Sequence, residues 1–175
     1  MSGSPAASTS RVTGWRCTPM SEKQDFVARY GGLFEHSPWV VERAAERLPL
    51  ADLHQGLMQV VRDATSEEQL GLIRAHPELA GKAAIDGTLT EASTAEQASA
   101  GLDRLTSDEF ARFHSLNRDY SAKFGFPFII CVRLTNKAAI LAAMESRLAN
   151  DREIEMGTAL AQIGEIVRLR LEDLK

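Results

Sequence analysis

The sequence is poor in cysteine, has no excess of basic residues and lacks long apolar runs. Its 175 residues include two cysteines, Cys17 and Cys131, which are too few for a disulfide framework. The formal net charge of −4 leaves no basic stripe to neutralise phosphates, which argues against a nucleic-acid partner. No apolar run has the length of a membrane span or of a secretory signal. We therefore expect a protein of the reducing cytoplasm that binds neither nucleic acid nor membrane.

The usual signatures of cofactor and metal sites are also missing. The chain has no glycine-rich phosphate loop, no His-Glu-x-x-His motif, no cysteine pair at metal spacing and no nucleophile elbow. Its four histidines, His36, His54, His76 and His114, are scattered, and no local cluster supplies converging ligands. If the protein is an enzyme, we expect it to work with side chains and backbone alone, without metal or other cofactor.

What the sequence does contain is a succession of helix signals. We interpret residues 1–20, rich in Ser, Ala, Thr and Gly, as a disordered tail before one domain, 21–175. Capping residues, apolar positions at three- and four-residue steps and Gly or Pro stops predict the helices of that domain. They are expected at 22–30, 37–48, 51–64, 66–75, from 93 onward, 106–125, 135–149 and 151–174. The predicted fold class is all-α, a compact single-domain multi-helix bundle with one short irregular apolar segment at 126–132.

The helix that ends near His76 carries the first candidate for chemistry. Pro77 has no N–H and disfavours α geometry at the preceding residue, so the imidazole is presented where the backbone breaks. An imidazole donates or accepts a proton near neutral pH. A lone histidine at a helix end is, however, more often a cap or a surface residue.

Four further polar residues have ordinary structural explanations of their own. Ser93 and Glu96 are spaced as a capping box, Gln97 would be an exposed helix residue, and Arg170 lies in a charged helix where surface ion pairs are the rule. Together with His76 they would instead form a small pocket for a planar, anionic ligand. Arginine would bind a carboxylate through two parallel hydrogen bonds.

The apolar segment at 126–132 also has two interpretations. It can be core, since periodicity does not classify so short a run. Its Gly and Pro neighbours, on the other hand, indicate a buried non-helical backbone whose N–H and C=O groups need partners. A ligand rich in amide groups would satisfy them.

Five blocks of the sequence form one ordered set. They are Gly32-Leu33-Phe34-Glu35-His36-Ser37-Pro38-Trp39-Val40, Ala75-His76-Pro77-Glu78-Leu79, Ser93-x-x-Glu96-Gln97 with Ala100-Gly101-Leu102, Leu116-Asn117-x-x-Tyr120-x-x-Lys123-Phe124-Gly125-Phe126-Pro127-Phe128-Ile129, and Ile166-x-x-Leu169-Arg170-Leu171. In this order, over residues 25–174, they resemble the family of the OHCU (2-oxo-4-hydroxy-4-carboxy-5-ureidoimidazoline) decarboxylases of urate degradation. The Phe-Gly-Phe-Pro-Phe and His-Pro blocks are the most specific.

The resemblance implies an all-α homodimer that needs no cofactor and releases CO2 from OHCU to give (S)-allantoin. It implies His76 as the catalytic histidine, with Glu96 and Arg170 as catalytic residues that hold the substrate and stabilise charge. The residues that it implies for substrate binding are Pro77, Ser93, Gln97, Phe128, Ile129, Ile130 and Cys131.

Two alternatives stay open at this point. One is a lyase that acts on a related ureido or purine-derived acid. The other is a non-enzymatic helical dimerisation module, in which the break at His76 is only a helix end. Such a module needs a broad exposed apolar face, and the one-sided apolar patterns of the predicted helices do not indicate one.

Overall fold

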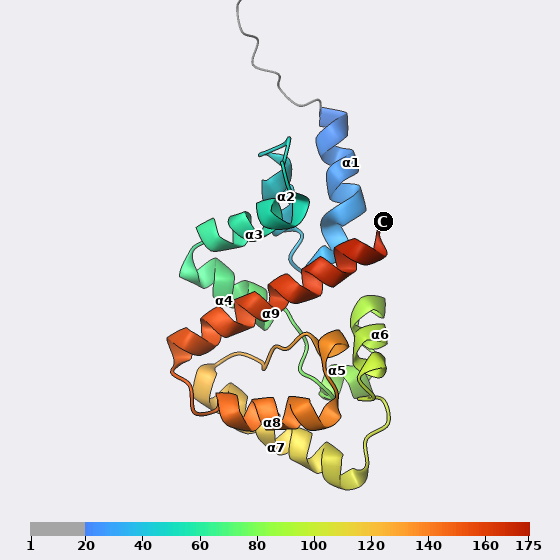
Figure 1. Ribbon diagram of the computed structural model, residues 1–175, viewed down its shortest axis with the longest axis vertical. Coiled ribbons are helices and arrows are strands. Elements are labelled where there is room, and N and C mark those ends of the chain that lie inside the picture. Colours follow the sequence, from blue (N-terminus) through green and yellow to red (C-terminus); the bar gives the residue numbers. More distant parts are fainter. Residues whose placement is uncertain (1–19) are drawn as a thin grey trace, which may run out of the picture.

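The computed structural model describes residues 20–175 as helices joined by short loops (Figure 1). Within this range there is no strand, which confirms the predicted all-α class. The expected disorder of the first residues concerns a part of the chain outside the described range. The elements are α1 (Met20–Tyr30), the 3-10 turn η1 (Gly31–Leu33), α2 (Trp39–Ala45), α3 (Leu53–Asp63), α4 (Ser66–Arg74), α5 (Lys82–Ile85), α6 (Glu91–Ser99), α7 (Ser107–Phe124), the 3-10 turn η2 (Val132–Leu134), α8 (Lys137–Arg147) and α9 (Arg152–Asp173).

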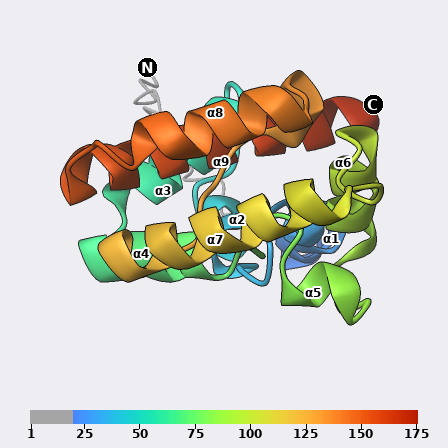
Figure 2. The same ribbon diagram turned by 90° about the horizontal axis from the view of Figure 1, so that it is seen from below.

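The last helix, α9, organises the molecule. Figure 1 shows it running diagonally across the middle, with α1 to α4 on one side and α5 to α8 on the other. It packs against α3, α4 and α7. Seen from below, α8 and α9 lie together on one side and α4, α5 and α7 on the other (Figure 2). Side chains of α9 can therefore meet side chains from both halves of the chain.

Capping residues set the ends of α7. Thr106 Oγ1 accepts the N–H of Glu109 at 3.2 Å, and Glu109 Oε2 accepts the N–H of Thr106 at 2.9 Å. This reciprocal pair satisfies two of the free N–H groups at the first turn. Gly125 ends the helix with a φ of 76°, a conformation that strains residues with a Cβ. Both ends agree with the sequence prediction.

The predicted capping box of Ser93 and Glu96 is wrong. Helix α6 begins at Glu91, and its N-cap is Thr90, whose Oγ1 accepts the N–H of Ser93 at 3.2 Å. Thr90 and Ser93 are both good N-cap residues, so the local rule cannot choose between them. The consequence is that the side chains of Ser93 and Glu96 do not cap the helix and are free for other contacts.

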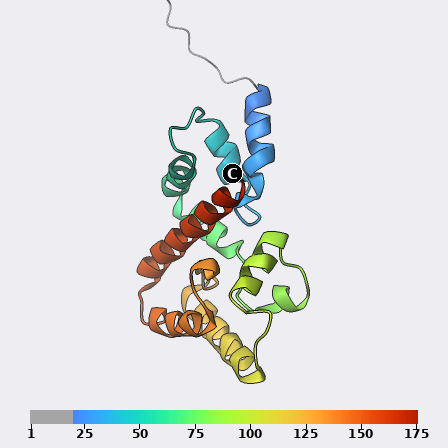
Figure 3. The same ribbon diagram turned by 45° about the vertical axis from the view of Figure 1, so that its right-hand side comes forward.

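The core includes the segment that was expected to be irregular. Residues 126–131 adopt no regular secondary structure and then enter η2, which packs against α6 (Figure 3). Phe128 is 1% exposed, and its ring centroid lies 5.3 Å from that of Tyr120 in an edge-to-face arrangement. Ile163 and Val167 of α9 belong to the same buried core as Phe128. This aromatic and aliphatic packing fixes a stretch of backbone that lacks the regular hydrogen bonds of a helix or a sheet.

None of the helices in the described part of the chain combines the length and the apolar character that crossing a membrane requires.

Candidate active site

His76 lies directly after α4, where the sequence predicts that the helix ends. Ala75 is the C-cap residue of α4, and the N–H of His76 still donates to the carbonyl of Ile73 at 3.1 Å. Pro77 cannot continue the helix because its nitrogen carries no hydrogen. The His76 side chain is buried and turns back onto α4, with Nδ1 2.9 Å from the carbonyl oxygen of Leu72. The imidazole is therefore fixed by the helix that it terminates.

This contact assigns the tautomer of the ring. A carbonyl oxygen can only accept, so Nδ1 of His76 carries the hydrogen and Nε2 of the neutral ring keeps its lone pair. Burial lowers the pKa of His76 and outweighs the Leu72 carbonyl, which acts in the opposite direction. At neutral pH the imidazole is uncharged, and its Nε2 can act as a base.

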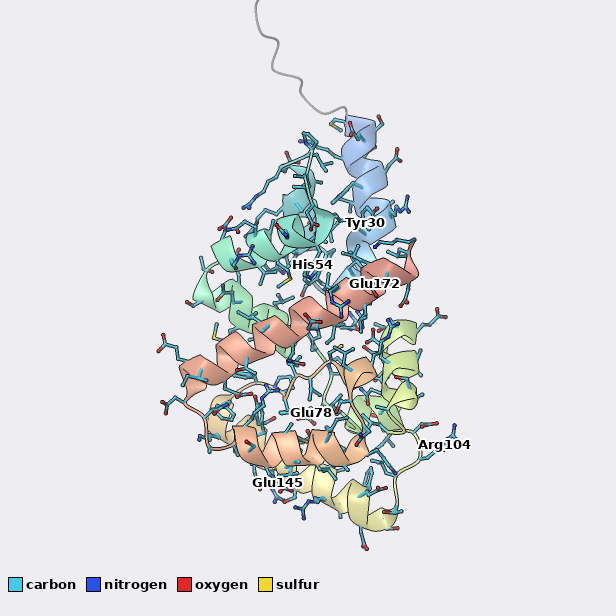
Figure 4. All side chains as sticks on the ribbon, in the orientation of Figure 1. Tyr30, His54, Glu78, Arg104, Glu145 and Glu172 are labelled. Atoms are coloured by element: carbon cyan, nitrogen blue, oxygen red, sulfur yellow. The ribbon has the colours of Figure 1, made fainter. Side chains whose placement is uncertain are left out.

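Two side chains from other helices hold the loop between α4 and α5. Ala80 has a φ of 50°, which residues other than glycine rarely adopt, and its N–H donates to Gln97 Oε1 at 3.0 Å. Asn117 Nδ2 donates to the carbonyl of Leu79 at 2.9 Å. Figure 4 shows Glu78 of this loop at the centre of the view, between α8 and α9. Gln97 is therefore buried and anchors the loop, whereas an exposed position was the default expectation.

Arg170 lies on the buried face of α9 and forms two ion pairs there. It is 7% exposed, and its Nε and Nη2 lie 2.8 Å from the two carboxylate oxygens of Glu96. Nη2 is also 3.0 Å from Glu35 Oε1, and Nη1 donates to the carbonyl of Leu33 at 3.2 Å. Burial opposes the charge, but the two carboxylates outweigh it and raise the pKa of Arg170. The sequence led us to expect a surface ion pair at Arg170, but both of its ion pairs are buried.

Glu35 is the residue of this cluster that sequence reasoning missed. It is 3% exposed, and its Oε1 accepts hydrogen bonds from the hydroxyls of Ser93 and of Thr90, the latter at 2.8 Å. Burial would raise the pKa of Glu35, but the bonds from Ser93, Thr90 and Arg170 outweigh burial and lower it. The available signal was an acid directly after the buried Phe34, because an acid in an apolar stretch is rarely buried without a partner.

These groups surround a small inner cavity of about 40 Å³. Of the ten site residues predicted from the sequence, Cys131 alone does not line it, because its N–H donates to Gln162 Oε1 at 2.9 Å on another side. Burial also raises the pKa of the Cys131 thiol, which keeps it protonated. The nine that line the cavity are His76, Pro77, Ser93, Glu96, Gln97, Phe128, Ile129, Ile130 and Arg170.

A larger outer cavity, of about 530 Å³, adjoins the inner one. Glu96 and Arg170 line both cavities, so their ion pair forms a common wall. Arg29 and Arg133 also line the outer cavity, together with Asp173, which pairs with Arg133 at 2.6 Å. The inner cavity has room for only a few water molecules. An organic ligand that contacts His76 therefore needs more room than the inner cavity alone provides.

The other three histidines lie away from both cavities. His54 Nε2 is 2.9 Å from the carbonyl of Gly164, in the half of the molecule that holds α3 (Figure 4). The His114 ring packs on Phe110 with centroids 4.3 Å apart, and His36 occupies the turn before α2 with a φ of 45°. Within residues 20–175, no group of three or more His, Cys, Asp or Glu side chains is placed to hold a metal ion.

The arrangement provides one base, one cation and two anions. Nε2 of neutral His76 can take a proton from a ligand, and the Arg170 guanidinium can stabilise a negative oxygen. Glu35 and Glu96 offset the charge of Arg170 and leave the three side chains with a net charge of −1. The chemistry that this site supports is proton transfer next to a developing negative charge.

Comparisons with known proteins agree with this chemistry. The family model of the OHCU decarboxylases matches residues 19–172. Two 2-oxo-4-hydroxy-4-carboxy-5-ureidoimidazoline decarboxylases are similar, that of Haloferax volcanii (41% identity over 87% of this chain and 90% of the relative) and that of Halalkalicoccus jeotgali (41% over 88% and 87%). A crystal structure of (S)-allantoin synthase superposes with a TM-score of 0.69 at 28% identity, covering 87% of this chain and 50% of that chain. The chain belongs to the OHCU decarboxylase family.

Proposed function

We propose that this protein decarboxylates OHCU to (S)-allantoin without a cofactor, the third step from urate to allantoin, as a homodimer in the cytoplasm. The observation that carries the proposal is a neutral imidazole, with Nε2 unprotonated, that lines one small cavity together with Arg170. Membership of the OHCU decarboxylase family supports the same reaction.

The substrate presents a hydroxyl and a carboxylate on one ring carbon. When the bond to the carboxylate breaks, CO2 leaves and the electron pair stays with the ring. The hydroxyl proton is lost as the carbonyl of the product forms. One proton is added to the neighbouring ring carbon and one to the ring nitrogen that was doubly bonded to it, so the anionic substrate gives neutral allantoin. An enzyme for this reaction has to stabilise the ring anion and control the face to which the proton returns.

His76 is the base in this scheme. Its Nε2 takes the hydroxyl proton while Nδ1 stays bonded to the Leu72 carbonyl, which stabilises the positive ring that forms. The low pKa that burial gives to His76 keeps the ring neutral and ready to accept the proton. Its position at the end of α4 keeps Nε2 fixed while the substrate changes charge.

Arg170 and Glu96 hold the substrate. The guanidinium binds an anionic or carbonyl oxygen, and the carboxylate of Glu96 accepts from ring or ureido N–H groups. Ser93 and Gln97, from the same face of α6, and Pro77 complete the wall. Unpaired backbone N–H groups of Phe128 and Ile130 supply further donors to the ring anion.

Circular dichroism tests the reaction directly. OHCU is generated from urate with the two preceding enzymes, and the optical signal of allantoin is followed with and without this protein. We expect an (S)-allantoin signal that grows well above the unaided rate, at which both enantiomers form. A trace equal to that of the control, from protein whose far-ultraviolet spectrum is helical, would contradict the proposal. Light scattering should give a mass near twice 19.2 kDa.

A further inference from the structure

Two side chains anchor the 128–131 segment from outside the inner cavity. The carbonyl of Ile129 accepts from Arg147 Nη1 at 2.8 Å, and the N–H of Cys131 donates to Gln162 Oε1 at 2.9 Å. Neither Arg147 nor Gln162 lines the inner cavity. The segment is thus held at the carbonyl of Ile129 and at the N–H of Cys131.

The Arg147 anchor is itself fixed by Glu155 of α9. Glu155 is fully buried, and its Oε1 accepts from Arg147 Nε at 2.7 Å. The hydroxyl of Tyr120 also donates to Oε1, and Asn150 Nδ2 donates to Oε2 at 2.8 Å. Glu155 and Gln162 are seven residues apart, which is about two turns of helix, so they project from the same face of α9. Both anchors therefore act on the segment from one side.

This arrangement determines what Ile130 can present. In a trans peptide unit the N–H and the C=O point in opposite directions. The N–H of Ile130 consequently points away from Arg147, and its carbonyl points away from Gln162. Within the described residues neither group makes a hydrogen bond, and Ile130 lines the inner cavity. In extended backbone, the N–H and C=O of one residue face the same side.

We propose that Gln162 and Arg147 are positioning residues that hold the segment so that the N–H and carbonyl of Ile130 face the inner cavity and pair with an amide or ureido edge of the substrate. The inference rests on the proposed function, because OHCU carries such edges on its ring and on its ureido arm. The guanidinium on the Ile129 carbonyl also polarises the peptide whose N–H belongs to Ile130, which strengthens that donor.

Gln162→Met tests the proposal, because it removes the acceptor for Cys131 and keeps the length of a half-buried side chain. A neutral hydrogen bond is worth about 0.5–1.5 kcal/mol, so we expect kcat/KM to fall about 2- to 10-fold, mainly through KM. The allantoin formed should also contain more of the R enantiomer, since the ring is held less firmly. Gln162→Glu keeps an acceptor oxygen and should recover most of both properties. Gln55→Met, at an exposed glutamine of α3, is the matched control and should change neither.

A second measurement does not depend on turnover. Calorimetry with (S)-allantoin should show a dissociation constant that rises about 2- to 10-fold in Gln162→Met, because the variant again lacks one neutral hydrogen bond. An unchanged constant, or an unchanged KM and enantiomer ratio in a folded variant, would overturn the positioning role and leave the proposed function intact. A wild-type protein that binds (S)-allantoin but does not act on OHCU would overturn the proposed function, and the Gln162 comparison would then be decided by binding alone. A wild type that neither binds nor reacts would overturn both.

Discussion

Arg170 bonds two carboxylates, and the two bonds differ in kind. Glu96 takes both Nε and Nη2 and lines the cavities, whereas Glu35 takes Nη2 from a buried position against Ser93 and Thr90. A substrate that draws Arg170 away from Glu96 would leave the bond to Glu35 in place. We therefore expect Glu35 to keep the guanidinium oriented when a substrate binds.

Glu35→Gln should reduce turnover more than it reduces stability. Gln can still accept from Ser93, but the bond to the Arg170 cation loses its partner charge. Because a hydrogen bond to a charged group is worth about 1.5–3 kcal/mol, we expect kcat/KM to fall at least about tenfold. The steady-state assay with OHCU measures this. Glu67→Gln, at an exposed acid of α4, is the control; equal activity of the two variants would remove Glu35 from the machinery.

His76→Ala should fold and lose most of its activity. A general base contributes about 10²- to 10⁴-fold to the rate, so kcat should fall by a factor in that range. The matched variant is His114→Ala, which removes an exposed histidine whose ring packs on Phe110. Initial rates from circular dichroism compare the two. Near wild-type turnover in His76→Ala would exclude the assigned role.

The pH dependence should reflect the buried state of the same imidazole. Burial lowers the pKa of His76 below its ordinary value of 6.5, so kcat/KM should hold at pH 6.5 and decline only in more acidic buffer. The stability of the fold changes with pH in the same direction. The unfolded chain binds the proton at higher pH than the folded chain, so the free energy of unfolding decreases as the pH falls below 6.5. Urea midpoints measured for wild type and His76→Ala should show this dependence in the wild type and a weaker one in the variant.

At the scale of the elements, the end of α7 can be used to measure how much a terminating glycine contributes to the stability of the fold. Gly125→Ala forces a Cβ onto a residue with φ of 76°, where its nearest neighbour, Arg74 Nη2, lies at an ordinary 3.5 Å, so the strain comes from the backbone. Left-handed geometry costs about 1–2 kcal/mol for an L residue. For a chain of this size that corresponds to a melting temperature lower by about 2–8 °C.

Gly71→Ala is the matched substitution within a helix. A Cβ at Gly71 meets nothing within 4 Å, and alanine in a helix interior is favoured over glycine by about 0.5–1 kcal/mol. We therefore expect opposite shifts of the melting temperature from the same chemical change. A stable Gly125→Ala protein would show that the end of α7 can rearrange.

The elements were predictable where a local rule has one solution. Thr106 with Glu109, and Gly125, fix α7 without competition, and Pro77 ends α4 because no residue can replace its missing N–H. The start of α6 was not predictable, since Thr90 and Ser93 obey the same rule. The buried hydroxyl of Ser93 bonds to Glu35, which lies far away in the sequence. A local sequence pattern cannot predict such a contact.

At the scale of the molecule, most residues of the site could be predicted, but the hydrogen bonds and ion pairs that join them could not. The family resemblance points to nine of the residues around the inner cavity. It gives no indication that Glu35 bonds Arg170, because the two are 135 residues apart and burial depends on the whole fold. The anchors of the 128–131 segment were equally hidden, as Gln162 is an ordinary helix residue by composition.

The same separation along the chain has a consequence for synthesis. At about 5–20 residues per second, the residues between Glu35 and Arg170 take about 7–27 s to add. For the last 74 of these residues, about 4–15 s, Glu35 and Glu96 both exist as carboxylates with no cation between them, and burying both is unfavourable. The cluster can close only after the ribosome has reached the last helix, so a chain stalled before Arg170 exposes an open acidic pair that distinguishes it from the finished protein.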